Sequence, residues 1–145
     1  MVFNKVYLNA AKTEALLLAS LRKLVSNTPS GIYVDGAHVE FMKGIANPIG
    51  LKCGPSTDPD ELLKLVETLN PSNSFGRLTL IARMGASQIR EKLSPLVKAI
   101  KKSGLAVGWC CDPMHGNTIK ASNGYKTRKV DDIMEEVKGF FEVQT

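Results

Sequence analysis

The chain has 145 residues, which suffice for one domain with a hydrophobic core but not for a complete eight-stranded α/β barrel of about 250 residues. Its formal net charge is +5, but the basic side chains are scattered, and aromatic residues are few around the one local basic cluster at 120–129. No apolar run is long enough to cross a bilayer, so we expect neither a nucleic acid nor a membrane as partner.

The residue pattern of the first 34 residues differs from that of the rest of the chain. Leucines recur at helical spacing over 10–25 and predict an N-terminal helix, and the turn-rich residues 26–31 predict a linker. We therefore divide the chain into an N-terminal helix and linker, 1–34, and an α/β domain, 35–145. Residues 1–13 contain no acid, but they also lack arginine and a serine-rich stretch, so they do not make a convincing transit peptide.

Strands and helices are predicted to alternate through the second region. Nearly all-apolar runs predict strands near 47–52, 77–83 and 106–111, typical of a parallel sheet covered on both faces, and helical spacing predicts helices near 59–69, 87–102 and 130–141. Asp58 and Pro59 are suited to begin the first of these helices, and Gly104 to end the second, which Pro95 should kink or divide. The pattern gives about three βα units, either as a short Rossmann-like sheet or as part of a barrel.

Three cysteines, Cys53, Cys110 and Cys111, are odd in number and lack a paired zinc spacing. The adjacent pair falls in an apolar predicted strand. We therefore expect buried thiols in a reducing compartment, and no disulfide framework.

Three ligand-type residues recur at intervals of roughly 30 residues, the length of one βα unit. Lys52, Arg83 and His115 each close or follow a predicted strand, so they could converge at one edge of the sheet on a phosphorylated substrate and a divalent metal. Each also has a plainer reading: Lys52 as a surface lysine, Arg83 as a helix cap or ion-pair partner, and His115 as a structural histidine. Asp112 is suited to orient His115, whereas His38 is expected to pack or to begin a helix.

Five ordered segments carry a family resemblance. They are 35–41 (DGAHVEF), 47–55 (NPIGLKCGP), 76–85 (GRLTLIARMG), 112–118 (DPMHGNT) and 139–143 (GFFEV). From about residue 35 onward, the chain resembles the class II (plant-type) 3-deoxy-D-arabino-heptulosonate 7-phosphate (DAHP) synthases. The resemblance implies a partial TIM (β/α)8-type barrel and a plastid location. It implies condensation of phosphoenolpyruvate with erythrose 4-phosphate, the first step of the shikimate pathway to chorismate and the aromatic amino acids.

The resemblance also assigns roles to the three residues. Lys52 and Arg83 match the cations that hold phosphoenolpyruvate. His115 matches a ligand of a divalent metal, Mn²⁺ in the first place and Co²⁺ in the second. No residue is assigned a catalytic role.

Departures from the family pattern bear on activity. Tyr33 and Val34 run straight into Asp35, where family members have a stretch whose Glu-Arg pair contacts phosphoenolpyruvate. The resemblance places the other three metal ligands outside this sequence, so we expect an internal piece of the enzyme that is inactive as an isolated chain. The alternative is a non-catalytic fragment or pseudoenzyme that binds phosphate ligands, associates with itself, or associates with an intact synthase subunit.

Overall fold

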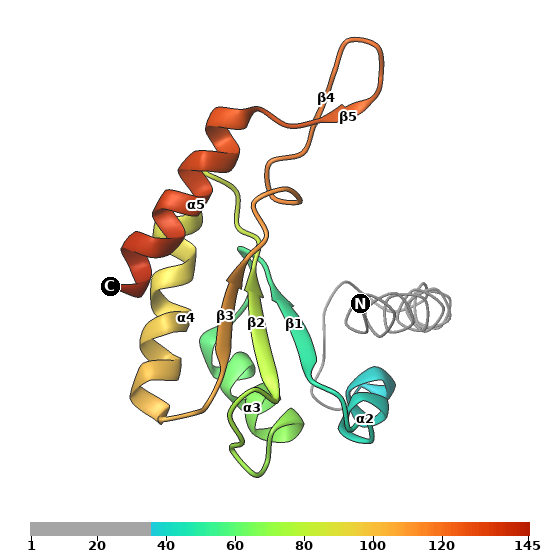
Figure 1. Ribbon diagram of the computed structural model, residues 1–145, viewed down its shortest axis with the longest axis vertical. Coiled ribbons are helices and arrows are strands. Elements are labelled where there is room, and N and C mark those ends of the chain that lie inside the picture. The colour runs from blue at the N-terminus through green and yellow to red at the C-terminus, as the bar shows by residue number, and fades with distance from the viewer. Residues whose placement is uncertain (1–35) are drawn as a thin grey trace, which may run out of the picture.

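The computed structural model describes residues 36–145, so the N-terminal helix predicted over 10–25 lies outside the described residues. The described part is an α/β fold in which strands and helices alternate as expected (Figure 1). Its elements are α2 (Ala37–Lys43), β1 (Ile49–Cys53), α3 (Pro59–Leu69), β2 (Leu78–Ala82), α4 (Ile89–Ser103), β3 (Gly108–Cys111), β4 (Ile119–Lys120), β5 (Lys126–Thr127) and α5 (Val130–Gln144).

The central sheet is parallel, with its strands in the order β1-β2-β3. Cys53 pairs with Ala82, and Ala82 pairs with Cys111, so the three strands end in register. Residues that directly follow these strands are therefore neighbours at the carboxyl edge of the sheet. In parallel α/β structures, this is the edge at which ligands bind.

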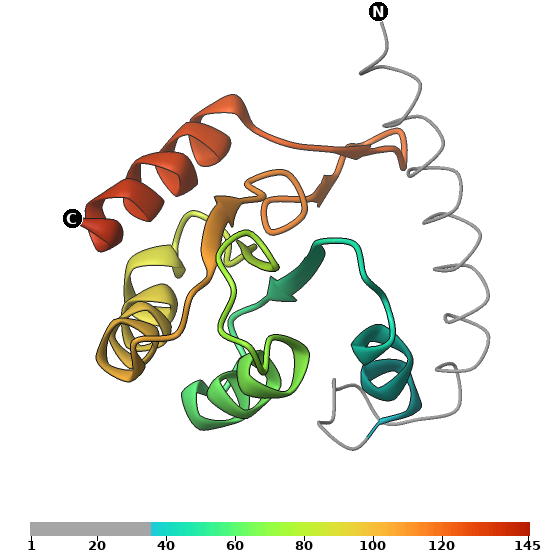
Figure 2. The same ribbon diagram turned by 60° about the horizontal axis from the view of Figure 1, so that its bottom comes forward.

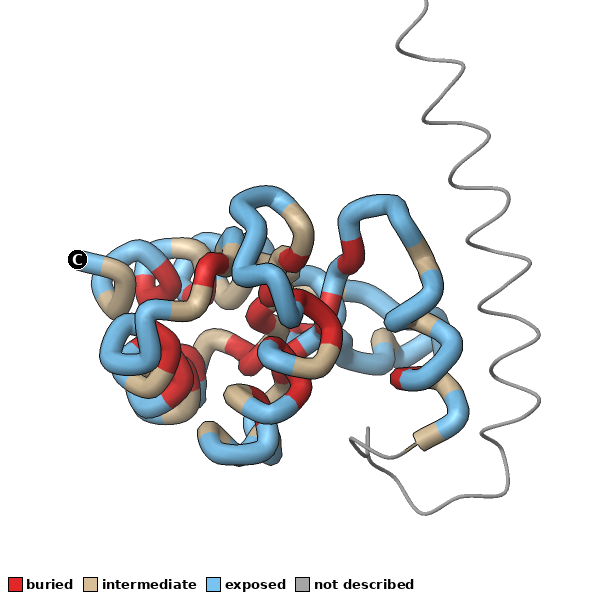
Figure 3. The backbone as a smooth tube through the Cα atoms, turned by 90° about the horizontal axis from the view of Figure 1, so that it is seen from below, coloured by how far each residue is buried: buried red, intermediate tan, exposed pale blue. Residues whose placement is uncertain are grey.

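One face of the sheet carries the core. Side chains alternate between the two faces of a strand, and the positions of Leu51, Cys53, Leu80 and Ala82 are all buried. Helices α3 and α4 lie on this side, α5 packs against α4, and buried positions gather where sheet and helices meet (Figures 2 and 3).

Within residues 36–145 no helix covers the other face of the sheet, so the expectation of a sheet covered on both faces is not met within these residues. Gly50, Lys52, Gly108 and Cys110 are all exposed there. Alternation along β3 places Cys110 on the open face and Cys111 on the covered one. The expectation of two buried thiols is therefore wrong for Cys110 and met only in part by the half-buried Cys111. Cys53 is buried, and all three thiols are free.

Helix termini follow the local chemistry of the sequence. The Asp58 carboxylate accepts the backbone N–H groups of Asp60 and Glu61 at 2.9 and 3.0 Å and caps α3, which begins at Pro59. Gly104 ends α4 in the left-handed conformation, with φ 71°.

Pro95 does not divide α4, which continues to Ser103 as one helix. Burial of Leu93, Leu96 and Val97 on both sides of the proline outweighs the one hydrogen bond that it removes.

No residue range was predicted for three short elements. Helix α2 places His38 at its start, as expected of that residue. Strands β4 and β5 form a two-stranded antiparallel hairpin that extends beyond the sheet (Figure 1). None of the helices in the described part is both long and apolar enough to span a membrane.

Candidate functional site

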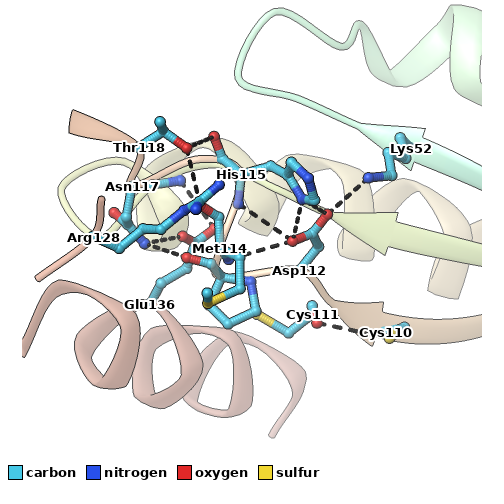
Figure 4. A network of polar contacts seen from close by, with 12 residues as sticks. Lys52, Cys110, Cys111, Asp112, Met114, His115, Asn117, Thr118, Arg128 and Glu136 are labelled. Carbon is cyan, nitrogen blue, oxygen red and sulfur yellow. Dashed lines mark hydrogen bonds and ion pairs between the residues drawn. The ribbon is translucent and has the colours of Figure 1, made fainter. Parts of the chain in front are cut away.

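The three residues singled out from the sequence lie at the carboxyl edge of the sheet. Lys52 is near the end of β1, Arg83 directly follows β2, and His115 lies in the loop after β3. The Asp112 Oδ2 atom is 2.8 Å from Lys52 Nζ and 2.6 Å from His115 Nδ1. One carboxylate, at the end of β3, thus brings Lys52 and His115 together (Figure 4).

The loop after β3 is built around the same carboxylate. Asp112 Oδ1 accepts the backbone N–H groups of Met114 and His115, both at 3.3 Å, so the chain turns back on Asp112 as it leaves the strand. The imidazole therefore presents Nδ1 to Asp112, and its Nε2 atom stays available in a side chain that is 58% exposed. A carboxylate on one ring nitrogen is the usual support of a metal-binding histidine.

Asp112 carries a stabilised negative charge. Partial burial by itself raises the pKa of its carboxyl group. Hydrogen bonds from Lys52 and His115, together with the charge of Lys52, outweigh burial and lower the pKa from 3.8 to about 2. Asp112 is therefore an anion at any pH near neutrality.

Arg83 occupies the same edge without contacting Lys52 or His115. Its backbone N–H donates to the Cys53 carbonyl at 2.9 Å, which continues the ladder between β1 and β2 by one step. Its Nε atom is buried and has no hydrogen-bond partner among residues 36–145. The interpretation of Arg83 as the partner of an acid is therefore not met within these residues, where its Nε donor is unpaired.

Two residues behind this edge were missed in the sequence. Glu136 of α5 is completely buried, and Asn117 is nearly so. Their polar atoms bond to each other and to the loop that follows Arg83. A signal was present, because Glu136 interrupts an apolar helical stripe formed with Ile133, Val137 and Phe140.

The donor set for a metal is small in the described part. His115 offers Nε2, but no three His, Cys, Asp or Glu side chains in residues 36–145 gather as a metal site would require. A bound metal would need the remaining protein ligands from outside this range.

Comparison with known proteins agrees with the resemblance. The family model described as "Class-II DAHP synthetase family" matches residues 32–145. The chain is 54% identical over 110 residues to the "Probable phospho-2-dehydro-3-deoxyheptonate aldolase, chloroplastic" of Catharanthus roseus, an alignment that covers 76% of this chain and 22% of the relative.

Two bacterial proteins named phospho-2-dehydro-3-deoxyheptonate aldolase are equally similar. The identity is 56% for the protein of Streptomyces coelicolor and 54% for that of Mycolicibacterium smegmatis, again over 110 residues, with 76% of this chain and 24% of each relative covered. The chain thus spans less than a quarter of the length of these relatives. The family model covers most of the chain, and on that ground the chain belongs to the class-II DAHP synthetase family.

Proposed function

We propose that this chain serves DAHP synthesis, in which phosphoenolpyruvate condenses with erythrose 4-phosphate and inorganic phosphate leaves. Its sheet would be one sector of a TIM-type barrel, with the open face turned to the barrel interior. The observation that carries the proposal is the placement of Lys52, Arg83 and His115 at the ends of three adjacent parallel strands. Family membership and the names of the relatives support it.

Lys52 and Arg83 would hold phosphoenolpyruvate. Two fixed cations at neighbouring strand ends match a substrate that carries both a phosphate and a carboxylate. They would orient its enol carbon toward the aldehyde of the second substrate. The unpartnered Nε atom of Arg83 supports this role, because a ligand oxygen would satisfy it.

His115 would bind a divalent metal through Nε2, with Asp112 orienting the ring through Nδ1. Mn²⁺ is the proposed ion and Co²⁺ the second choice, since both accept imidazole together with oxygen ligands. When bound, such a metal would polarise the aldehyde carbonyl as a Lewis acid.

The metal site can be tested with the two histidines of the chain. Mn²⁺ added at low concentration should broaden the NMR signals of the His115 ring and spare those of His38, which lies in α2. Equal broadening of both histidines would contradict the assignment of His115.

Phosphoenolpyruvate binding tests the central proposal. We expect the ligand to raise the melting temperature of the 145-residue chain and the K52A/R83A variant to lose this effect, because a ligand stabilises only the state that binds it. The matched control is K64A/K98A, which removes two exposed lysines from the outer surfaces of α3 and α4. A similar rise in melting temperature with phosphoenolpyruvate in both double variants would contradict the proposal.

A condensation assay separates the two candidate functions. With phosphoenolpyruvate, erythrose 4-phosphate and Mn²⁺, we expect phosphoenolpyruvate to bind without phosphate release by the chain alone. His115 can contact the metal, but as a single protein ligand it does not complete a catalytic metal site. Phosphate release that disappears in the H115A variant would instead identify an active enzyme, with its site completed by residues outside 36–145 or by a second subunit.

The open face of the sheet favours the second candidate, a phosphate-binding chain that associates with itself or with an intact synthase subunit. Sedimentation of the chain alone, and of the chain with a full-length relative, would decide this. Sedimentation only as a monomer in both would contradict association. A plastid location is also proposed, supported by the chloroplastic relative alone, since the names of the bacterial ones give no location.

A further inference from the structure

The loops that carry Arg83 and His115 touch each other through two glycines. A Cβ atom on Gly116 would lie 2.5 Å from the backbone nitrogen of Gly85, a distance that real Cβ atoms do not adopt. Gly85 itself has φ 86°, in the left-handed region that other residues rarely occupy. Gly116 is adjacent to His115 and Gly85 is two residues from Arg83, so this contact sets how closely the two site loops approach.

A buried carboxylate binds both loops from behind. Glu136 Oε1 accepts the backbone N–H groups of Met84 at 2.7 Å and Gly85 at 2.9 Å. Its Oε2 atom accepts Asn117 Nδ2 at 2.6 Å, and Asn117 Oδ1 accepts the N–H group of Ala86 at 2.9 Å. We call these four hydrogen bonds the loop clamp; Figure 4 shows Glu136 reaching from α5 toward Asn117.

Stability alone is a poor explanation of this arrangement. Glu136 is 0% exposed, and its hydrogen-bond partners within residues 36–145 are neutral donors, so no cation among them offsets its desolvation. Apolar side chains of similar size at such positions are often as stabilising as buried charges or more so, whereas directed hydrogen bonds fix a geometry. What these bonds fix is the position of residues 84–86 relative to residue 117.

We propose that Glu136 is a positioning residue, which through the loop clamp sets the separation between Arg83 and His115. The proposal rests on the function proposed above, in which Arg83 holds phosphoenolpyruvate and His115 holds the metal. A misplacement of about 1 Å between groups that act on one substrate can cost about a hundredfold in rate. Two ligands on separate loops therefore need a common support. Glu136 provides one, because it bonds to Met84 and Gly85 in one loop and to Asn117 in the other.

The variant E136Q tests the clamp with little change in shape. Its neutral amide oxygen can still accept the Met84 and Gly85 N–H groups, but more weakly than a carboxylate does. Its NH₂ group would face the Asn117 donor, so the bond from α5 to Asn117 is lost. The matched control is E135Q, which removes the same charge from the neighbouring exposed residue on α5, a partner of Arg90.

Two measurements on the full chain are compared for wild type, E136Q and E135Q. Amide hydrogen exchange should accelerate about tenfold or more at Met84, Gly85 and Ala86 in E136Q, with the amides of β2 unchanged. The dissociation constant for phosphoenolpyruvate should rise about tenfold in E136Q and stay at the wild-type value in E135Q.

Three results would overturn the proposal. The first is amide hydrogen exchange at residues 84–86 that does not change in E136Q. The second is equal acceleration in β2 and in the loops, which would indicate a general structural role. The third is an equal affinity of E136Q and E135Q for phosphoenolpyruvate. If the wild-type chain binds no phosphoenolpyruvate, the proposed function fails. The hydrogen-exchange rates alone then test the loop clamp.

Discussion

A few carboxylate side chains hold the residues at the carboxyl edge in place, and each of them contacts more than one residue there. Asp112 contacts both Lys52 and His115, and Glu136 contacts residues in both loops that extend from this edge. In each case a single carboxylate organises groups that lie far apart in the sequence. The sequence indicated Asp112, because it lies three residues from His115. For Glu136 it showed only a charged residue in an apolar helical stripe, and not the partners Met84 and Gly85, which are 52 and 51 residues away.

The three thiols should react with an alkylating reagent in a fixed order. Cys110 is exposed and should be modified first. Burial raises the pKa of Cys53 from 9.0 to about 12, and burial together with the charge of Glu136 does the same for the half-buried Cys111. Because only the thiolate reacts, a rise of about three units lowers the reactive fraction roughly a thousandfold near neutral pH.

Peptide mapping after timed reaction with iodoacetamide measures this order. In the urea-unfolded chain, which is the control, all three cysteines should react at similar rates. Modification of native Cys53 as fast as Cys110 would contradict the buried position of Cys53.

At the scale of elements, the sequence predicted most where the signals are local. The long strands and helices lie within about two residues of their expected bounds at most ends, because an apolar run, a capping Asp58, Pro59 or Gly104 acts on its immediate neighbours. Helix α2 and the hairpin of β4 and β5 are short and largely exposed, so they left no periodic pattern to detect.

Removal of the α3 cap should cost about 1 kcal/mol of unfolding free energy. The variant D58A leaves the N–H groups of Asp60 and Glu61 without their acceptor. Urea unfolding measures the difference, with E67A, an exposed position in the last turn of α3, as the control. A loss in D58A no larger than in E67A would show that the cap contributes nothing.

The packing of α5 on α4 depends on a residue without a side chain. Gly139 is buried, and a Cβ atom there would lie 2.5 Å from Ile89 Cγ2 and 3.1 Å from Arg90 Nη1. We expect G139A to destabilise the protein by about 1–3 kcal/mol through overpacking, which exceeds the gain of about 1 kcal/mol from alanine in a helix.

Thermal and urea unfolding both measure this effect, and the neighbouring exposed K138A serves as the control. Because Ile89 is completely buried, it has little room to yield. A G139A protein more stable than wild type would mean that the two helices separate without cost.

For the whole molecule, the sequence predicted the parallel α/β plan but not which surfaces are covered. Apolar runs such as residues 78–82 indicate burial on both faces, whereas only one face of the sheet has helices against it in residues 36–145. The composition of a strand shows that its faces can pack against apolar side chains, but it does not show which part of the chain provides those side chains. For the same reason, the roles of Lys52, Arg83 and His115 stay predictions although their shared edge could be anticipated.

Amide hydrogen exchange should be slowest in the central strand of the sheet and fastest in the hairpin of β4 and β5. Strand β2 pairs with a neighbour on each side and should exchange slowest, because its amides open only with the core. The hairpin of β4 and β5, at residues 119–127, has exposed residues in both strands, so its amides should exchange fastest. Protection of the hairpin equal to that of β2 would reveal a segment packed upon it.

The position of Glu136 along the chain has a consequence for folding during synthesis. Sheet order equals chain order, so β2 can pair with β1, and β3 with β2, soon after each strand leaves the ribosome. The N–H groups of Met84 and Gly85 must instead wait for an acceptor that is translated about 50 residues later. The nascent sheet can therefore form while its site loops are still unordered, and the loops acquire their final positions only when α5 arrives.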